Sequence, residues 1–262
     1  MKQPFFSIIT STYNSEVHLP QTIASIREQG FEDYEHIFVD AFSTDGTLKI
    51  IEDYQKDDSR VKLVQAEPKG ISNAMNVGIE HASGIVIHHL HSDDFYHSSG
   101  SLQAVHDLFS QDKKLTMLIG LCSRIIDGEQ HSGLLPESTF QRRKTLLRYM
   151  IHLNCYIAHP STFIKKEVFD RHGVFDESYR YSMDYELWLR ILHKERFKMI
   201  NQELAAFRHG ANSSDLEKGQ IDDDRARKEH SKGFRAFVAN TFLKGPIASR
   251  ERRNAEKGTI RF

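Results

Sequence analysis

The stretch "IVIHHLHSDDFY" (residues 85–96) joins an apolar run to two adjacent carboxylates. The run "IVIHHL" is rich in β-forming residues and predicts a buried strand, which Asp93 and Asp94 follow almost at once. His88 and His89 are neighbours on this strand, so their side chains are expected to face opposite sides of it. The stretch therefore predicts a sheet with a polar site at the end of one of its strands.

Three more strand patterns precede this one, and each is followed by a helical pattern. The strands are expected at residues 5–10, 34–40 and 61–66, and the helices at 17–30, 47–56 and 71–84. Alternation of this kind predicts an α/β fold with a mostly parallel central sheet that is flanked by helices. Ligands bind such sheets at the carboxyl ends of the strands.

Polar residues gather at those carboxyl ends. Thr12 and Tyr13 follow the first strand, Asp40 ends the second, and Asp93 and Asp94 follow the fourth. Each could instead serve only as a turn or cap residue, and the two adjacent Asp residues could simply begin a helix near residue 98. The chain has neither GxGxxG after the first strand nor GxxxxGK[ST], so a nucleotide would have to be held by side chains and a metal.

Composition narrows the classes of protein. The 262 residues carry a formal net charge of -1 with 27% charged residues, which gives no general attraction to nucleic acid or to a membrane. We find no secretory signal or membrane-spanning run in the sequence and expect a cytoplasmic protein. Cys122 and Cys155 lack CxxC spacing, so we expect buried thiols and neither a disulfide framework nor a thiolate metal site.

Five segments, taken in order, resemble glycosyltransferase family 2. They are "SIITSTYNSEVHLPQTIASIREQ" (7–29), "IFVDAFSTDGTLKII" (37–51), "GISNAMNVGIEHASG" (70–84), "HSDDFY" (91–96) and "HPSTFIKKEVFDRHGVFDESYRYSMDYELWLRI" (159–191). The resemblance implies an inverting enzyme of hexosyltransferase type with the GT-A fold, a Rossmann-like α/β arrangement. It also implies one domain over residues 1–213, with a nucleotide-binding half (1–110) and an acceptor half (111–213).

The same resemblance assigns roles to individual residues. The nucleotide-binding positions that it implies are Thr12, Tyr13, Asp40, Asn76 and Asp93. A divalent cation, Mn²⁺ or Mg²⁺, would be held by Asp94 and Asp93 of the DxD-type motif, with His91 and His209 as further candidate ligands. Asp184 would be the catalytic base, and His159 would line the acceptor side.

His91 departs from the family pattern, because the first position of the motif is commonly Asp or Asn. A neutral imidazole can ligate a transition metal, which would favour Mn²⁺ over Mg²⁺, or His91 could only hydrogen-bond the ribose. A zinc site built from the neighbouring histidines is disfavoured, because His88 and His89 should point in opposite directions and no thiolate is near.

Simpler structural roles remain open for three of these residues. Asp184 stands near the start of the helix predicted from "DYELWLRI", where a carboxylate also stabilises the helix dipole. A lone histidine such as His159 is commonly a hydrogen-bonded structural residue, and Asn76 could be a polar position on a helix flank.

Residues 214–262 form a charged extension with helical spacing. Phe234, Phe237 and Phe242 share a helical face, and six Lys or Arg residues follow between 244 and 261. The extension is either a solvated tail or a peripheral contact with anionic lipid at the inner face of the membrane.

Together these observations predict transfer of a sugar from a nucleotide donor, most simply a UDP-sugar, to a hydroxyl on a glycan or lipid-linked acceptor. Polysaccharide, glycolipid or cell-envelope glycan synthesis would use such a reaction. The alternatives are a non-catalytic or degenerate sugar-nucleotide-binding protein and a nucleotidyltransferase. No nucleic-acid partner is expected.

Overall fold

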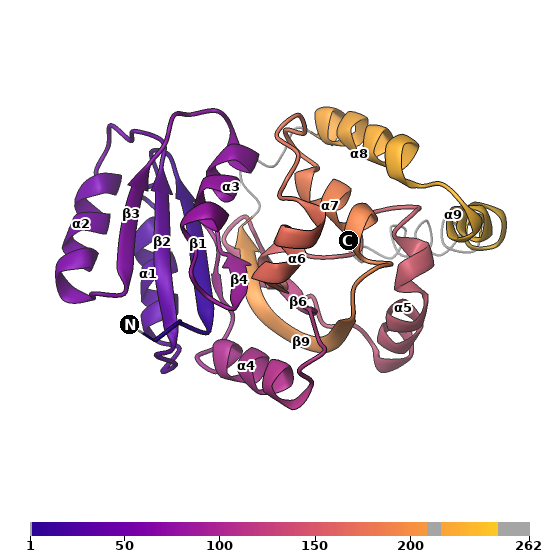
Figure 1. Ribbon diagram of the computed structural model, residues 1–262, viewed down its shortest axis with the longest axis horizontal. Coiled ribbons are helices and arrows are strands. Elements are labelled where there is room, and N and C mark those ends of the chain that lie inside the picture. Colours follow the sequence, from indigo (N-terminus) through magenta and orange to yellow (C-terminus); the bar gives the residue numbers. More distant parts are fainter. Residues whose placement is uncertain (1, 209–215, 246–262) are drawn as a thin grey trace.

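The computed structural model describes residues 2–208 and 216–245. Its strands form one sheet in the order β3-β2-β1-β4-β8-β6-β9-β5, with β7 paired to β6. Helices cover both faces of this sheet, and Figure 1 shows α4 on the opposite side from α6 and α7. The expected α/β fold class is confirmed.

The first four strands are parallel, as the alternating pattern predicts. They are β1 (Phe6–Thr12), β2 (Tyr34–Asp40), β3 (Val61–Gln65) and β4 (Val86–His89), and they alternate with α1 (Leu19–Arg27), α2 (Thr47–Asp57) and α3 (Ile71–His81). Every residue of β1, β2 and β4 is buried, because helices cover the sheet on both faces. Phe38 packs under α1 and α2, whereas Ile37 and Val39 pack under α3.

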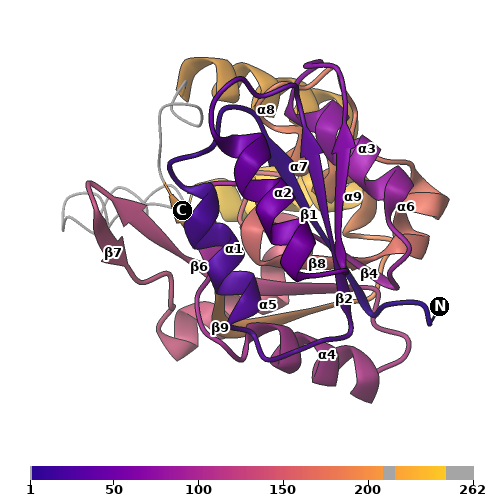
Figure 2. The same ribbon diagram turned by 90° about the vertical axis from the view of Figure 1, so that its left-hand side faces the viewer.

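Beyond β4 the sheet is mixed. Its elements are β5 (Phe95–Tyr96), α4 (Ser101–Gln111), β6 (Met117–Ile126), β7 (Glu129–His131), α5 (Glu137–Met150), η1 (His159–Ser161), β8 (Thr162–Lys165), α6 (Lys166–His172), α7 (Met183–Ile191) and β9 (Phe197–Arg208). Strand β8 is antiparallel to both β4 and β6, while β6 and β9 are parallel. The β6–β7 hairpin projects from the body of the molecule (Figure 2).

The C-terminal region begins with α8 (Leu216–His230) and continues through α9 (Phe234–Val238) and η2 (Ala239–Leu243). Helix α8 packs on α7, and Ala226 of α8 is fully buried in the main core. The Asp222 carboxylate of α8 accepts the backbone N–H groups of Arg180 (3.0 Å) and Tyr181 (2.9 Å), just before α7. The domain boundary expected at residue 213 lies outside the described residues. None of the described helices is long and apolar enough to cross a membrane.

Candidate functional site

Asp40 lies at the carboxyl end of β2, directly opposite Thr12 at the end of β1. Its fully buried carboxylate accepts the Thr12 hydroxyl (2.9 Å), the Ser43 hydroxyl (2.6 Å) and the Ser43 backbone N–H (2.8 Å). A carboxylate offers about four acceptor positions. Three protein donors therefore fix its orientation and leave room for one donor from a ligand.

Two exposed aromatic side chains extend from the loops beside Asp40. Tyr13 is 62% exposed and Phe42 is 47% exposed. Phe42 has φ 56°, a left-handed conformation that is uncommon for a bulky residue. The Asn14 amide oxygen accepts the Thr44 backbone N–H (2.9 Å), which joins the loops that carry the two rings. Phe42 was not among the expected site residues, although an aromatic residue within the polar loop "AFSTDG" was the available signal.

Asp94 is fully buried in the loop after β4, whereas Asp93 is partly exposed. One oxygen of Asp94, Oδ1, accepts the Arg208 backbone N–H (3.2 Å), and the other, Oδ2, has no hydrogen-bond partner among the described residues. Burial and the neighbouring Asp93 raise the pKa of Asp94 well above its usual range. The two Asp residues do not begin a helix, because β5 follows them and α4 starts only at Ser101.

His88 and His89 point to opposite faces of the sheet, as expected. The His88 ring contacts the Tyr96 hydroxyl (2.8 Å) and the Pro160 carbonyl (3.0 Å) and stacks on Phe163, so its role is structural. The His89 ring packs on the other face against His159, with ring centroids 5.6 Å apart.

His91 also stacks on His159, at 5.4 Å between centroids and 10° between planes. Ring-nitrogen lone pairs lie in the ring plane, so parallel rings do not direct them at one ion. Within residues 2–208 and 216–245, no three His, Cys, Asp or Glu side chains converge on a possible metal position. His209, the other expected histidine ligand, lies outside the described residues.

His159 connects the strand-end loops to α7. Its ring lies 6.1 Å from that of Trp188, a fully buried residue on α7. Asp184 precedes Trp188 by four residues and so lies on the same face of the helix. The histidine contacts thus connect the loop of Asp93 and Asp94 with the helix that carries the expected base.

Asp184 is held in the first turn of α7, where its Oδ1 accepts the Tyr185 backbone N–H (2.8 Å). Burial raises the pKa of Asp184 to about 6; Asp223 of α8 raises it as well, and the Tyr185 hydrogen bond opposes the rise. Ser182, not Asp184, occupies the N-cap position of the helix. A carboxyl group with this pKa is mostly ionised at neutral pH and is a stronger base than an ordinary aspartate.

Asn76 has different neighbours from the other expected residues. Its amide pairs with the backbone N–H and carbonyl of Phe175 (3.0 and 2.9 Å) and with the Glu177 carboxylate (3.0 Å). These bonds join α3 to the loop before α7. The expected nucleotide contact of Asn76 stays a prediction.

The residues after β4 suit a divalent cation that is shared with a phosphate ligand. Asp94 Oδ2 is a buried, unpartnered carboxylate oxygen, and Asp93 stands next to it in the loop. Mg²⁺ and similar cations are commonly bound by one or two carboxylates together with substrate phosphates, so a complete protein cage is not required.

The chain resembles known proteins over most of its length. The model of the family "Glycosyl transferase family 2" matches residues 7–173. The uncharacterized glycosyltransferase EpsJ of Bacillus subtilis is 29% identical over 220 residues, which cover 80% of this chain and 62% of that protein. A putative teichuronic acid biosynthesis glycosyltransferase of the same organism, TuaG, is 38% identical over 93 residues, or 35% of this chain and 37% of TuaG.

Two solved structures share the fold. The structure of residues 1–349 of TarS from S. aureus with UDP has a TM-score of 0.71 at 21% identity and covers 98% of this chain and 76% of that one. The mannosyltransferase PcManGT from Pyrobaculum calidifontis, with GDP-Man and Mn²⁺, has a TM-score of 0.66 at 17% identity. The match covers 99% of this chain and 77% of that one. The family match and the relatives confirm the resemblance inferred from the sequence. The chain belongs to glycosyltransferase family 2.

Proposed function

We propose that this protein transfers a sugar from a UDP-sugar to a hydroxyl acceptor, with inversion, during synthesis of a cell-envelope glycan. The observation that carries the proposal is Asp184, a partly buried carboxyl group with a pKa of about 6, linked through Trp188 and His159 to the loop of Asp93 and Asp94. Relatives named for teichuronic acid biosynthesis and as a chondroitin synthase support the glycan assignment. The similar TarS structure holds UDP-GlcNAc, which supports the choice of donor.

The donor nucleoside would bind at the ends of β1 and β2. Asp40 would use its remaining acceptor position for an N–H group of the base, with Thr12 holding the carboxylate in place. Tyr13 and Phe42 offer exposed ring faces, and stacking of a base on an aromatic ring contributes about 1–3 kcal/mol.

The diphosphate would lie over the loop after β4. Asp94 and Asp93 would hold a divalent cation there, with His91 and His209 as candidate additional ligands. Such a cation, when bound, stabilises the charge that develops on the diphosphate leaving group.

In the transfer step the acceptor hydroxyl oxygen attacks the anomeric carbon from the side opposite the diphosphate. The new carbon–oxygen bond forms as the bond to the diphosphate breaks, and that bond's electron pair leaves with the diphosphate. Asp184 takes the hydroxyl proton, a role that typically contributes 10²–10⁴-fold to the rate. His159 would stand beside the acceptor.

Calorimetry with UDP and GDP, each with Mn²⁺ and with EDTA, tests donor binding. We expect UDP to bind preferentially and only with the cation. Asp94→Ala should weaken binding at least about tenfold, whereas Ala at the exposed Asp170 should not. Equal affinity in EDTA would contradict the proposed cation site. Binding without any release of UDP from UDP-sugars would instead favour a non-catalytic sugar-nucleotide-binding protein.

The C-terminal helices support a location at the inner face of the membrane. Phe234, Phe237 and Phe242 are 74%, 61% and 63% exposed, and the basic residues that follow Gly245 lie outside the described residues. We expect the full chain to bind vesicles with anionic lipid at low salt, and replacement of all three Phe residues by Ser to reduce that binding. If neither the wild-type chain nor the variant with three Ser replacements binds such vesicles, the extension does not contact lipid.

A further inference from the structure

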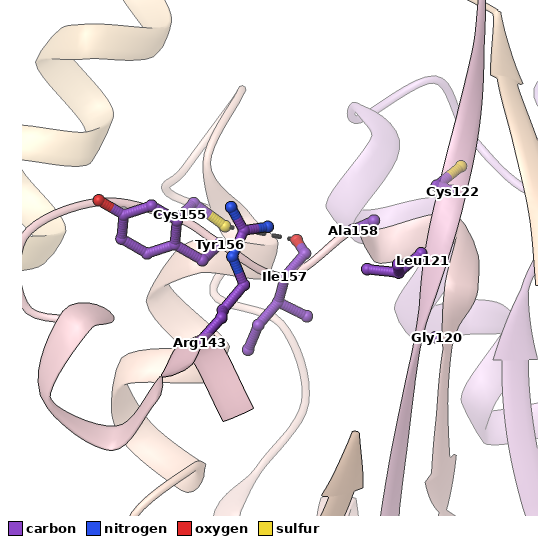
Figure 3. Close-up of a pocket in the computed structure, with 8 residues that line it drawn as sticks. All are labelled: Gly120, Leu121, Cys122, Arg143, Cys155, Tyr156, Ile157 and Ala158. Carbon is purple, nitrogen blue, oxygen red and sulfur yellow. Dashed lines mark hydrogen bonds between the residues drawn. The ribbon is translucent and has the colours of Figure 1, made fainter. Parts of the chain in front are cut away.

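A cavity of about 110 Å³ lies between β6, α5 and the segment before η1. Its lining residues come from these three parts of the chain: Gly120, Leu121 and Cys122; Arg143; and Cys155, Tyr156, Ile157 and Ala158. Figure 3 shows the Arg143 side chain extending from α5 between Tyr156 and Ile157. A single water needs about 10–15 Å³ of such space, so the cavity has room for a group of several heavy atoms.

The cavity borders the proposed acceptor side of the site. Ala158 lines it and directly precedes His159. Burial raises the pKa of the Cys155 thiol, and the Asp184 carboxylate raises it as well, so Asp184 lies within electrostatic range of this wall of the cavity. The Tyr185 hydroxyl, next to Asp184, donates to the Ile151 carbonyl (2.6 Å) just beyond α5, which fixes α7 relative to this region.

Arg143 gives the cavity its charge. Among the eight lining residues, all in the described part of the chain, it alone is ionised at neutral pH. The guanidinium lies over the Tyr156 ring, 5.4 Å from its centroid, and this cation–π contact restrains the side chain. A guanidinium presents a planar fork of N–H donors that matches carboxylate and phosphate oxygens. The hydrogen bonds between such charged groups are strongest where water is partly excluded.

We propose that this cavity binds an anionic group of the acceptor, a carboxylate or a phosphate, through Arg143. The inference rests on the proposed function, because it identifies the class of acceptor for the same site. An acidic sugar or a phosphate-containing chain anchored by Arg143 would present a neighbouring hydroxyl toward Asp184.

NMR titration of the full-length protein tests the proposal with four small probes. Methyl glucuronide and glycerol 3-phosphate supply the carboxylate and the phosphate, and methyl glucoside and glycerol are their neutral counterparts. We expect at least one anion to shift the backbone amide signals of Gly120 and Ala158 and to bind at least about tenfold more tightly than its neutral counterpart. The anion that binds identifies which of the two groups the acceptor carries.

Arg143→Gln should abolish this difference, and Arg143→Lys should restore part of it because the charge remains while the planar fork is lost. Arg142→Gln is the matched control: it removes the same charge from an exposed position on the same helix, and it should leave binding intact. Thermal unfolding of each variant verifies that it is folded. Equal binding of anions and neutral probes, or equal loss in the Arg142 and Arg143 variants, would overturn the proposal.

Calorimetry with UDP on the same samples separates this inference from the proposed function. UDP binding without anion binding would overturn the cavity proposal alone. Anion binding without UDP binding would overturn the proposed function and leave the cavity as an anion site.

Discussion

Replacing Asp184 by Asn should raise the stability of the protein at neutral pH while it removes catalysis. The pKa of Asp184 is about 6 in the folded protein, compared with an ordinary value of 3.8. Between these two values the folded state holds a proton that the unfolded state has released, so the free energy of unfolding falls as pH rises through this window. A difference of about 2 between the folded and unfolded pKa values corresponds to about 3 kcal/mol in the free energy of unfolding.

Asn has nearly the same size as Asp and no charge, so the variant avoids this cost. At pH 7.5 we expect its free energy of unfolding to exceed that of the wild type by up to about 3 kcal/mol, or about 2–4 °C in Tm for each kcal/mol. At pH 4, where wild-type Asp184 is protonated when folded, most of the gain should disappear. Asp170→Asn, at an exposed carboxylate, is the control and should change Tm little at either pH. A lower Tm for Asp184→Asn at pH 7.5 would refute this reasoning.

Turnover provides the second measurement, as release of UDP from a UDP-sugar with acceptor. We expect turnover of the variant to fall 10²–10⁴-fold while its dissociation constant for UDP is unchanged, because the residues proposed to bind the UDP-sugar lie on other loops. The wild-type rate should rise with pH around pH 6 as Asp184 loses its proton. A variant that keeps more than about a third of wild-type turnover would exclude Asp184 as the base.

Two further changes test the electrostatic influence of Asp223 on Asp184 and the packing of α3 on β1. Asp223→Asn should lower the pKa of Asp184, because it removes a neighbouring negative charge, and the acidic limb of the pH–rate profile should then move to lower pH; an unmoved limb would show that Asp223 has no such influence. Gly78→Ala should destabilise the fold by about 1–3 kcal/mol in chemical denaturation, since the new Cβ would lie 2.3 Å from Cγ2 of the buried Ile9. The Gly100→Ala control meets nothing within 4 Å and should be nearly neutral.

The part of the chain from β1 to β4 could be predicted from sequence because its signals are local. Each strand of β1 to β4 is a short apolar run, and each is followed by a polar turn and a helical pattern. Parallel strands bring their carboxyl ends to one edge, which is why Thr12 and Asp40 could be expected to meet before their 2.9 Å hydrogen bond was seen.

The part of the chain after β4 could not be predicted in this way. Strand β8 is antiparallel to β4 and β6 and needs no crossover helix. The parallel neighbours β6 and β9 are far apart in the sequence, with β7, β8 and several helices between them, so these strands leave no regular alternation of strand and helix. The contact of His91 with His159 joins residues 68 positions apart, and no periodicity encodes such a pairing. The raised pKa of Asp184 likewise depends on burial by distant segments and on Asp223 of α8.

The hydrogen-bonding groups that lack partners are concentrated around the proposed site. Buried side-chain atoms without a partner among the described residues are found in and near the loops of this site in Ser11, His89, His91, Asp94, His159, Trp188 and Arg208, and elsewhere in Tyr34, His36 and Tyr54. Folded proteins leave few such atoms, because each costs about 1–3 kcal/mol when it is left unsatisfied. Among residues outside the proposed site, His88 has partners in Tyr96 and Pro160, whereas Tyr34, His36 and Tyr54 each have a buried atom without one. Because several of the unpartnered atoms lie in the loop after β4 and around His159, we expect the phosphates and hydroxyls of a bound donor to complete their hydrogen bonds.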